Sequence, residues 1–168
     1  TKSKLKKKSD KTVIIFVATS SVDNRKGFRY LFEAVEKFTK DYQIILPAHP
    51  RLKNFINEKN ISHSSINLID PLSYIDFMSL VYGSKLVLTD SGGIQEETTY
   101  LGISCLTLRE ETERPITVTE GTNKVIGLEK ENIINEINNV LDSKISYETN
   151  IKYWDGETSD RIYEILFD

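Results

Sequence analysis

Cysteine is almost absent from this chain of 168 residues, which contains one cysteine, one methionine and one tryptophan. The single cysteine, Cys105, cannot form a disulfide within the chain, and it leaves no cysteine cluster that could bind zinc. Long apolar runs are missing too, because no stretch approaches the roughly 20 residues that span a bilayer. The lysine-rich start is not followed by the apolar segment of a signal peptide. We therefore expect a soluble, cytoplasmic protein with no metal site and no membrane partner.

Basic residues are scarce outside the first 11 positions. That segment holds six lysines and one acid, Asp10, whereas the remaining residues carry 16 basic and 24 acidic side chains. Affinity for nucleic-acid phosphates comes from clustered lysine and arginine, so the acidic body argues against a nucleic-acid partner. Because like charges in a block repel one another, we interpret residues 1–11 as a basic tail or linker and residues 12–168 as one domain. A polyanion-binding role for the lysines is the alternative.

Apolar runs of strand length alternate with amphipathic helical stretches from residue 12 onward. This alternation indicates repeated βα units around a parallel sheet. The predicted strands are 13–17, 43–46, 67–69, 85–88, 104–108 and 124–126. The predicted helices are 26–40, one that begins near 51, 74–82, 93–101, 129–141 and a closing helix at 159–167. The fold class is therefore α/β, a Rossmann-like arrangement of three layers with helices on both faces of a parallel sheet.

The strongest local signal for a binding site is residues 89–97, Thr-Asp-Ser-Gly-Gly-Ile-Gln-Glu-Glu. It places a strand end, two glycines and a helix start in succession. The first amides of a helix are unpaired and carry a partial positive charge, and glycine lets an anion approach the backbone closely. Ser91, Gly92 and Gly93 are therefore a candidate phosphate site. The alternative is an ordinary tight turn between a strand and a helix.

Glu97 lies four residues after Gly93, one helical turn beyond the candidate phosphate site. Its carboxylate would be near a ribose attached to that phosphate, although a solvated helix charge is the alternative. Arg109 and Arg114 follow the next strand, at the carboxyl edge where open α/β sheets bind ligands. They could hold phosphate, or they could simply pair with the neighbouring acids at 110–111.

Several sequence runs occur together in a fixed order. They are Asp-Ser-Gly-Gly-Ile-Gln-Glu-Glu at 90–97, Thr-Glu-Arg-Pro at 112–115, Gly-Thr-Asn at 121–123, Pro-Ala-His-Pro-Arg at 47–51, Asp-Pro-Leu at 70–72 and Tyr-Trp-Asp-Gly at 153–156. This set resembles the motifs of the non-hydrolysing UDP-N-acetylglucosamine (UDP-GlcNAc) 2-epimerases. The resemblance implies the second domain of a two-domain enzyme of the glycosyltransferase-B type, with UDP or a UDP-N-acetylhexosamine as ligand and no cofactor.

The resemblance also implies roles for individual residues. Ser91, Gly92 and Gly93 would hold the diphosphate, Glu97 the ribose and Phe77 the uracil, and Arg114 would line the UDP pocket. His49 matches a histidine of the family's effector region, although a turn histidine before a proline is the alternative. The residues at 18–24 lack the His-Arg pair that the family has after its first strand, so no catalytic residue is assigned.

The family interconverts UDP-GlcNAc and UDP-N-acetylmannosamine (UDP-ManNAc) for polysaccharide biosynthesis by eliminating UDP and adding it back with C2 inverted. Its first domain supplies most of the catalytic carboxylates and has no counterpart here, so we expect the isolated chain to bind UDP without turnover. The partner is then the missing N-terminal catalytic domain, and whether the chain forms a homodimer is open. The alternatives are a non-catalytic nucleotide-sugar-binding module and the donor-binding half of a glycosyltransferase.

Overall fold

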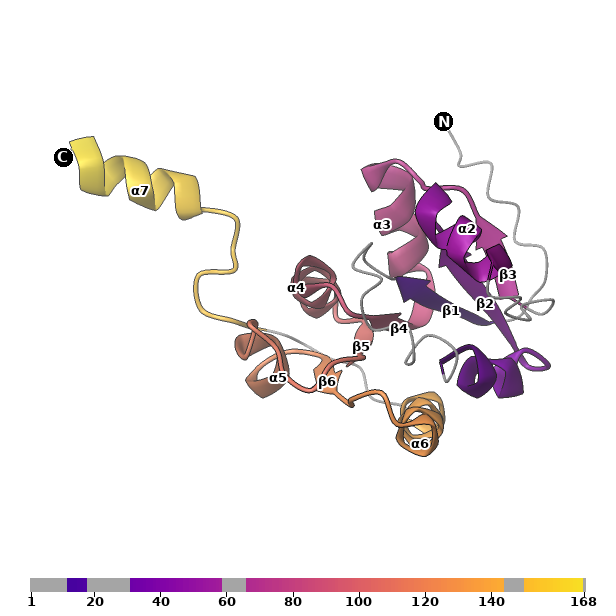
Figure 1. Ribbon diagram of the computed structural model, residues 1–168. Helices are drawn as coiled ribbons and strands as arrows, with labels where there is room; N and C mark the ends of the chain where they lie inside the picture. Colours follow the sequence, from indigo (N-terminus) through magenta and orange to yellow (C-terminus); the bar gives the residue numbers. More distant parts are fainter. Residues whose placement is uncertain (1–11, 18–30, 59–65, 144–149, 168) are drawn as a thin grey trace.

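The computed structural model describes residues 12–17, 31–58, 66–143 and 150–167 (Figure 1). In this part of the chain, parallel strands form one six-stranded sheet in the order β3-β2-β1-β4-β5-β6. The strands are β1 (Thr12–Val17), β2 (Tyr42–Pro47), β3 (Ile66–Ile69), β4 (Ser84–Thr89), β5 (Ser104–Thr107) and β6 (Asn123–Val125). The predicted α/β class is confirmed, and the predicted strands agree with these bounds to within about two residues. The predicted basic tail at 1–11 and the segment at 18–24 lie outside the described residues.

The sheet is buried on both faces. On one face, Ile14 and Phe16 of β1 join a core cluster with the helical residues 31–35, α2 (Pro50–Glu58) and α6 (Lys130–Asp142). On the other face, Val13 and Ile15 pack with α3 (Tyr74–Tyr82) and with Ile94 of α4 (Gly92–Tyr100). Successive side chains of a strand point to opposite faces, which is why the apolar run of β1 serves both clusters. The sheet therefore lies between two layers of helices, which is the predicted three-layer arrangement.

The order of the strands determines where a ligand can bind. The chain builds the sheet outward from β1 through β2 to β3, then returns to the other side of β1 with β4. In open parallel sheets the crevice at such a reversal, at the carboxyl ends of the strands, is where ligands bind. The turn from β4 to α4 lies at this place, so the fold puts the candidate phosphate site at the expected edge.

Two helical segments differ from the prediction, and a third forms where predicted but is exposed. The helix predicted at 26–40 ends as a 3₁₀ turn, η1 (Glu36–Phe38), because the backbone tightens into bonds three residues apart; its start lies outside the described residues. The short helix α5 (Ile116–Thr119) was not predicted. The closing helix α7 (Thr158–Phe167) forms where predicted, but it buries none of its residues. It stands away from the sheet at the end of an extended segment (Figure 1).

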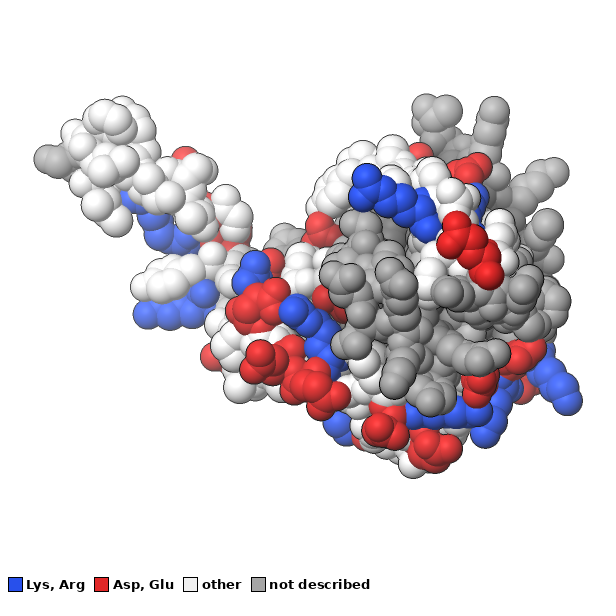
Figure 2. Space-filling view, viewed as in Figure 1, with Lys and Arg blue, Asp and Glu red and all other residues white. Residues whose placement is uncertain are grey.

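The surface of α7 is mostly apolar. Its exposed side chains include Ile165, which is 81% exposed, and Phe167, which is 72% exposed. Figure 2 shows α7 as a largely uncharged projection, whereas acidic and basic side chains are interspersed over the body in that view. The helix predicted at 159–167 is confirmed, and its apolar side chains are exposed in the described structure.

Candidate functional site

The turn from β4 to α4 leaves the first amides of α4 open. Ser91 is the N-cap residue with an extended backbone, and its side chain makes no capping hydrogen bond. Its amide instead donates to Thr89 Oγ1 over 3.0 Å, which ties the turn to the end of β4. A Cβ added at Gly93 would meet no heavy atom within 4 Å. With respect to the residues that the structure describes, the helix start therefore combines unpaired donors, partial positive charge and free space, which is what an anion needs.

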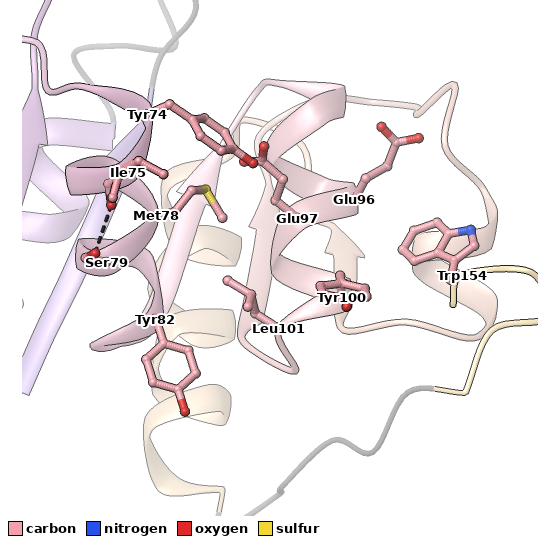
Figure 3. Close-up of a pocket in the computed structure, with 10 residues that line it drawn as sticks. All are labelled: Tyr74, Ile75, Met78, Ser79, Tyr82, Glu96, Glu97, Tyr100, Leu101 and Trp154. Carbon is pink, nitrogen blue, oxygen red and sulfur yellow. Dashed lines mark hydrogen bonds between the residues drawn. The ribbon is translucent and has the colours of Figure 1, made fainter. Parts of the chain in front are cut away.

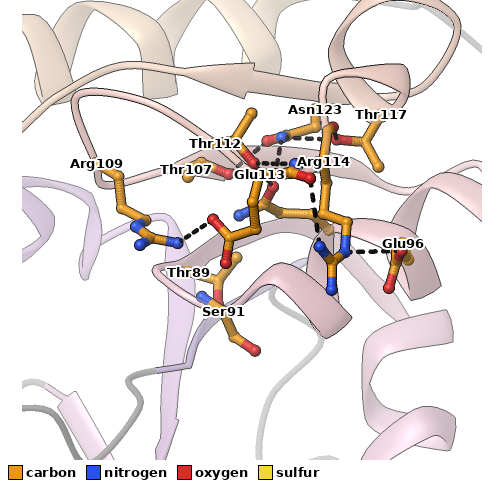
Figure 4. Close-up of polar contacts among 11 residues, drawn as sticks. Thr89, Ser91, Glu96, Thr107, Arg109, Thr112, Glu113, Arg114, Thr117 and Asn123 are labelled. Atoms are coloured by element: carbon orange, nitrogen blue, oxygen red, sulfur yellow. Dashed lines mark hydrogen bonds and ion pairs between the residues drawn. The ribbon is translucent and has the colours of Figure 1, made fainter.

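The loop after β5 lies against this helix start. A Cβ added at Gly92 would be 3.4 Å from Glu113 Oε1 and 3.6 Å from Arg114 Cγ. Arg114 Nε is 2.9 Å from Glu96 Oε1, and Arg109 Nη1 donates to Glu113 Oε2 over 2.7 Å (Figure 4). The arginines thus reach the predicted position, but their suggested pairing with the acids at 110–111 is wrong. Arg109 pairs instead with a glutamate four residues further along, and Arg114 pairs with one on α4.

Glu113 is charged in this arrangement. A hydrogen bond from its own backbone amide, together with the charges of Arg109 and Arg114, holds the pKa of the Glu113 carboxyl below its usual range. Its carboxylate lies beside Gly92, where a bound phosphate would also be negative. An anionic ligand at the start of α4 therefore has to displace Glu113 and can take over its contact with Arg109.

Glu97 lies one turn further along α4. The Tyr74 hydroxyl of α3 points toward its carboxylate (Figure 3), and this neighbouring acceptor raises the pKa of that tyrosine. Both side chains lie at one end of a groove of about 770 Å³ between α3 and α4 (Figure 3). The groove is lined by Tyr74, Ile75, Met78, Ser79, Tyr82, Glu96, Glu97, Tyr100, Leu101 and Trp154. Glu97 thus borders a concave surface.

Two predicted residues lie apart from this cluster. Phe77 is partly buried and packs with Leu80 and Ile94 against the sheet, so it is not among the residues that line the groove. His49 is exposed after β2, two strands from β4, and its Nδ1 accepts a hydrogen bond from the Arg51 amide over 3.3 Å. The structure therefore brings together Ser91, Gly92, Gly93 and Arg114, with Glu97 one turn away.

The chemistry available at this edge of the sheet is binding of an anion. Backbone amides and guanidinium groups can neutralise a phosphate, and carboxylates can accept hydrogen bonds from sugar hydroxyls. Burial raises the pKa of the Cys105 thiol to about 11, so this cysteine is protonated at neutral pH and is no nucleophile. The described residues contain no group of His, Cys, Asp and Glu that could hold a metal ion. None of the helices in the described part of the chain has the length and apolar character that crossing a membrane requires.

A family model described as UDP-N-acetylglucosamine 2-epimerase matches residues 1–167. The chain belongs to the UDP-N-acetylglucosamine 2-epimerase family. The epimerase of Methanocaldococcus jannaschii is 35% identical over 153 residues, which make up 87% of this chain and 41% of that relative. The structure of the M. jannaschii epimerase with UDP-GlcNAc and UDP has a TM-score of 0.79 and 34% identity, covering 93% of this chain and 45% of that one. For the S. aureus MnaA structure with UDP, the TM-score is 0.81 and the identity 34%, and the match covers 94% of this chain and 44% of that one.

This epimerase-family chain spans less than half the length of these relatives. The matched half is their C-terminal part. The resemblance inferred from the sequence runs is thereby confirmed at the level of the family and of the fold. The motif runs at 90–97 and 112–115 meet at the start of α4, although they are separated in the sequence.

Sequence reasoning gave no role to a buried polar cluster beneath the site. Gln95 and Thr107 are fully buried and Asn123 is 5% exposed. Thr107 Oγ1 donates to Asn123 Oδ1 over 2.6 Å, and Asn123 Nδ2 donates to Gln95 Oε1 over 3.2 Å. One signal could have revealed part of this cluster: Gln95, Thr98 and Thr99 recur at the spacing of one buried helix face, and polar residues on such a face need partners.

Proposed function

We propose that this chain is the UDP-binding part of a UDP-GlcNAc 2-epimerase, which interconverts UDP-GlcNAc and UDP-ManNAc. One observation carries the proposal: the open amides at the start of α4 lie beside the Arg114 loop, at the edge where the strand order reverses. A diphosphate fits this combination of donors and positive charge. The relatives solved with UDP and with UDP-GlcNAc support the same ligand class for this chain.

Each residue would contact a different part of the nucleotide. The Ser91 hydroxyl and the amides of Gly92 and Gly93 would hold the diphosphate, and Arg114 would leave Glu96 to pair with a phosphate oxygen. Glu97 would accept hydrogen bonds from the ribose hydroxyls at the groove that it lines together with Tyr74. Phe77 would contact the uracil from its half-buried position on α3, and His49 would serve an effector.

The contribution of this chain to the reaction would be electrostatic. As UDP leaves the sugar, negative charge grows on the diphosphate, and donors that are already oriented stabilise that charge without having to reorganise. Epimerisation also needs groups that act on C2 and its proton from the other side of the substrate. We assign those groups to the part of the relatives that this chain does not span, and we expect this chain alone to bind UDP without turnover.

Calorimetric titration of UDP into two glycine variants tests the proposed site. Gly92→Ala adds a methyl group at the start of α4, which should keep the phosphate from approaching the backbone amides. Each charge-assisted hydrogen bond there contributes about 1.5–3 kcal/mol, so losing one weakens UDP binding by roughly tenfold or more. In the free protein this methyl group has ordinary contact distances, the nearest atom being 3.4 Å away. The fold should therefore survive the substitution.

The matched control is Gly83→Ala at the opposite end of β4, where the added Cβ would also meet its nearest atom at an ordinary distance, 3.6 Å. This variant should bind UDP as the unaltered chain does. Equal affinity of the Gly92→Ala variant and the control would refute the proposed diphosphate site.

A further inference from the structure

We infer that Thr112 and Gln95 are positioning residues that fix Arg114 beside the start of α4 before any ligand arrives. The inference rests on the proposed UDP site and concerns how that site is kept in a binding-competent form. It assigns to Thr112 a function in affinity for the diphosphate, although its own hydroxyl donates to Gln95.

Thr112 links α4 to the backbone of Arg114 through a single hydroxyl group. Its Oγ1 donates to Gln95 Oε1 over 2.5 Å and accepts a hydrogen bond from the Arg114 amide over 3.0 Å. The carbonyl of Arg114 is held as well, because Thr117 Oγ1 donates to it over 2.7 Å. Both polar groups of the Arg114 backbone are therefore tied to threonine side chains.

These two threonines are anchored to the same buried cluster. Asn123 Nδ2 donates both to Gln95 Oε1 and to Thr117 Oγ1, over 3.2 and 3.0 Å. Through Asn123 the cluster reaches β6, and through Thr107 it reaches β5. Gln95 is fully buried in α4, the helix whose first amides would bind the phosphate. The Arg114 loop and the start of α4 are thus held in a fixed relation by one network.

The network also contains a buried donor whose presence is unfavourable for stability. Among the described residues, Gln95 Nε2 is buried without a hydrogen-bond partner, and leaving a donor unpaired in the interior is unfavourable. An apolar side chain would avoid this cost. A glutamine at this position therefore points to a requirement for its acceptor oxygen, which meets both Thr112 and Asn123. A loop that is ordered in advance loses less conformational entropy on binding.

An isosteric pair of substitutions at Thr112 tests the inference. Thr112→Val removes the hydroxyl and keeps the shape, whereas Thr112→Ser keeps the hydroxyl. The control Thr119→Val makes the same change at an exposed position of α5, where the hydroxyl's hydrogen bond within the described part of the chain is to Pro115 O at 3.4 Å. Affinities for UDP and for uridine, which lacks the phosphates, are measured by NMR titration up to millimolar ligand.

We expect Thr112→Val to weaken UDP binding by roughly tenfold, because the Arg114 loop must then be ordered at the moment of binding. Uridine binding should change by less than about twofold, since uridine lacks the groups that Arg114 would contact. Thr112→Ser and Thr119→Val should match the unaltered chain. Equal losses for UDP and uridine, or a serine variant as weak as the valine variant, would indicate a general structural role and overturn the inference.

Amide hydrogen exchange in the unaltered, ligand-free chain provides a test that needs no variant. The Arg114 amide should exchange more slowly than the amide of exposed Glu111, because Thr112 holds it. Equal exchange rates would overturn the inference. If the unaltered chain does not bind UDP, the proposed function fails together with the inference; if it binds UDP and Thr112→Val binds equally well, the inference alone fails.

Discussion

The cationic side chains beside the candidate site have anionic partners in the absence of ligand. Arg114 pairs with Glu96, and Arg109 pairs with Glu113, whose carboxylate lies near Gly92. Such partly exposed ion pairs contribute little to stability, about 0–1 kcal/mol each. Exchanging a carboxylate for a phosphate is therefore not prevented by the strength of these pairs, and the surroundings of Gly92 can adapt to an anion.

Gly121, in the Gly-Thr-Asn run at 121–123, is required by close packing and not by contact with a ligand. A Cβ at this position would lie 2.5 Å from Thr117 O and 2.5 Å from Thr99 Cγ2. Because a backbone carbonyl cannot move away freely, Gly121→Ala should lower the free energy of unfolding by about 1–3 kcal/mol. Urea denaturation measures the change. Gly93→Ala is the control, since its Cβ meets nothing within 4 Å; equal stability of the two variants would contradict this account.

The position of a single residue was predictable where the local sequence alone indicates the backbone structure. Gly92 and Gly93 could be recognised because a strand end, two glycines and a helix start occur in succession. The partners of Arg109 and Arg114 could not, because Glu96 is distant in the sequence and meets Arg114 only after α4 and the loop have packed. The same holds for the contact between Gln95 and Thr112, which are 17 residues apart.

Secondary-structure elements were predictable to the extent that local signals mark their ends. The prediction for α3 matches its observed bounds: Ser73 caps its start through the Asp76 amide, and Gly83 follows its last residue. The four-residue helix α5 is too short to show a helical period. For α7 the helix itself was predictable, whereas its separation from the sheet was not, because the sequence period does not identify a packing partner.

Helix α7 should therefore add little to the stability of the domain. It has no buried residues, and its ion pair between Arg161 and Asp155 is local. Removing residues 157–168 should change the midpoint of thermal unfolding by less than about 2 °C, given that 1 kcal/mol corresponds to roughly 2–4 °C at this size. Circular dichroism measures the midpoint. A fall of several degrees would show that α7 packs against the domain in solution.

At the scale of the whole molecule, the sheet order determines the position of the site. The reversal between β1 and β4 places the β4–α4 turn at the carboxyl edge, and β5 brings the Arg114 loop to the same edge. The chain spans less than half the length of its epimerase relatives. Binding of UDP is the part of the proposed function that this arrangement supports most directly.

The measurement that tests this central claim most directly is an NMR titration of the ¹⁵N-labelled chain with UDP. The account predicts the largest amide shifts at Gly92, Gly93 and Arg114, with the amide of Gly83 at the other end of β4 unchanged. Shifts confined to other parts of the chain, or no shifts at millimolar UDP, would contradict the claim that the start of α4 holds the diphosphate.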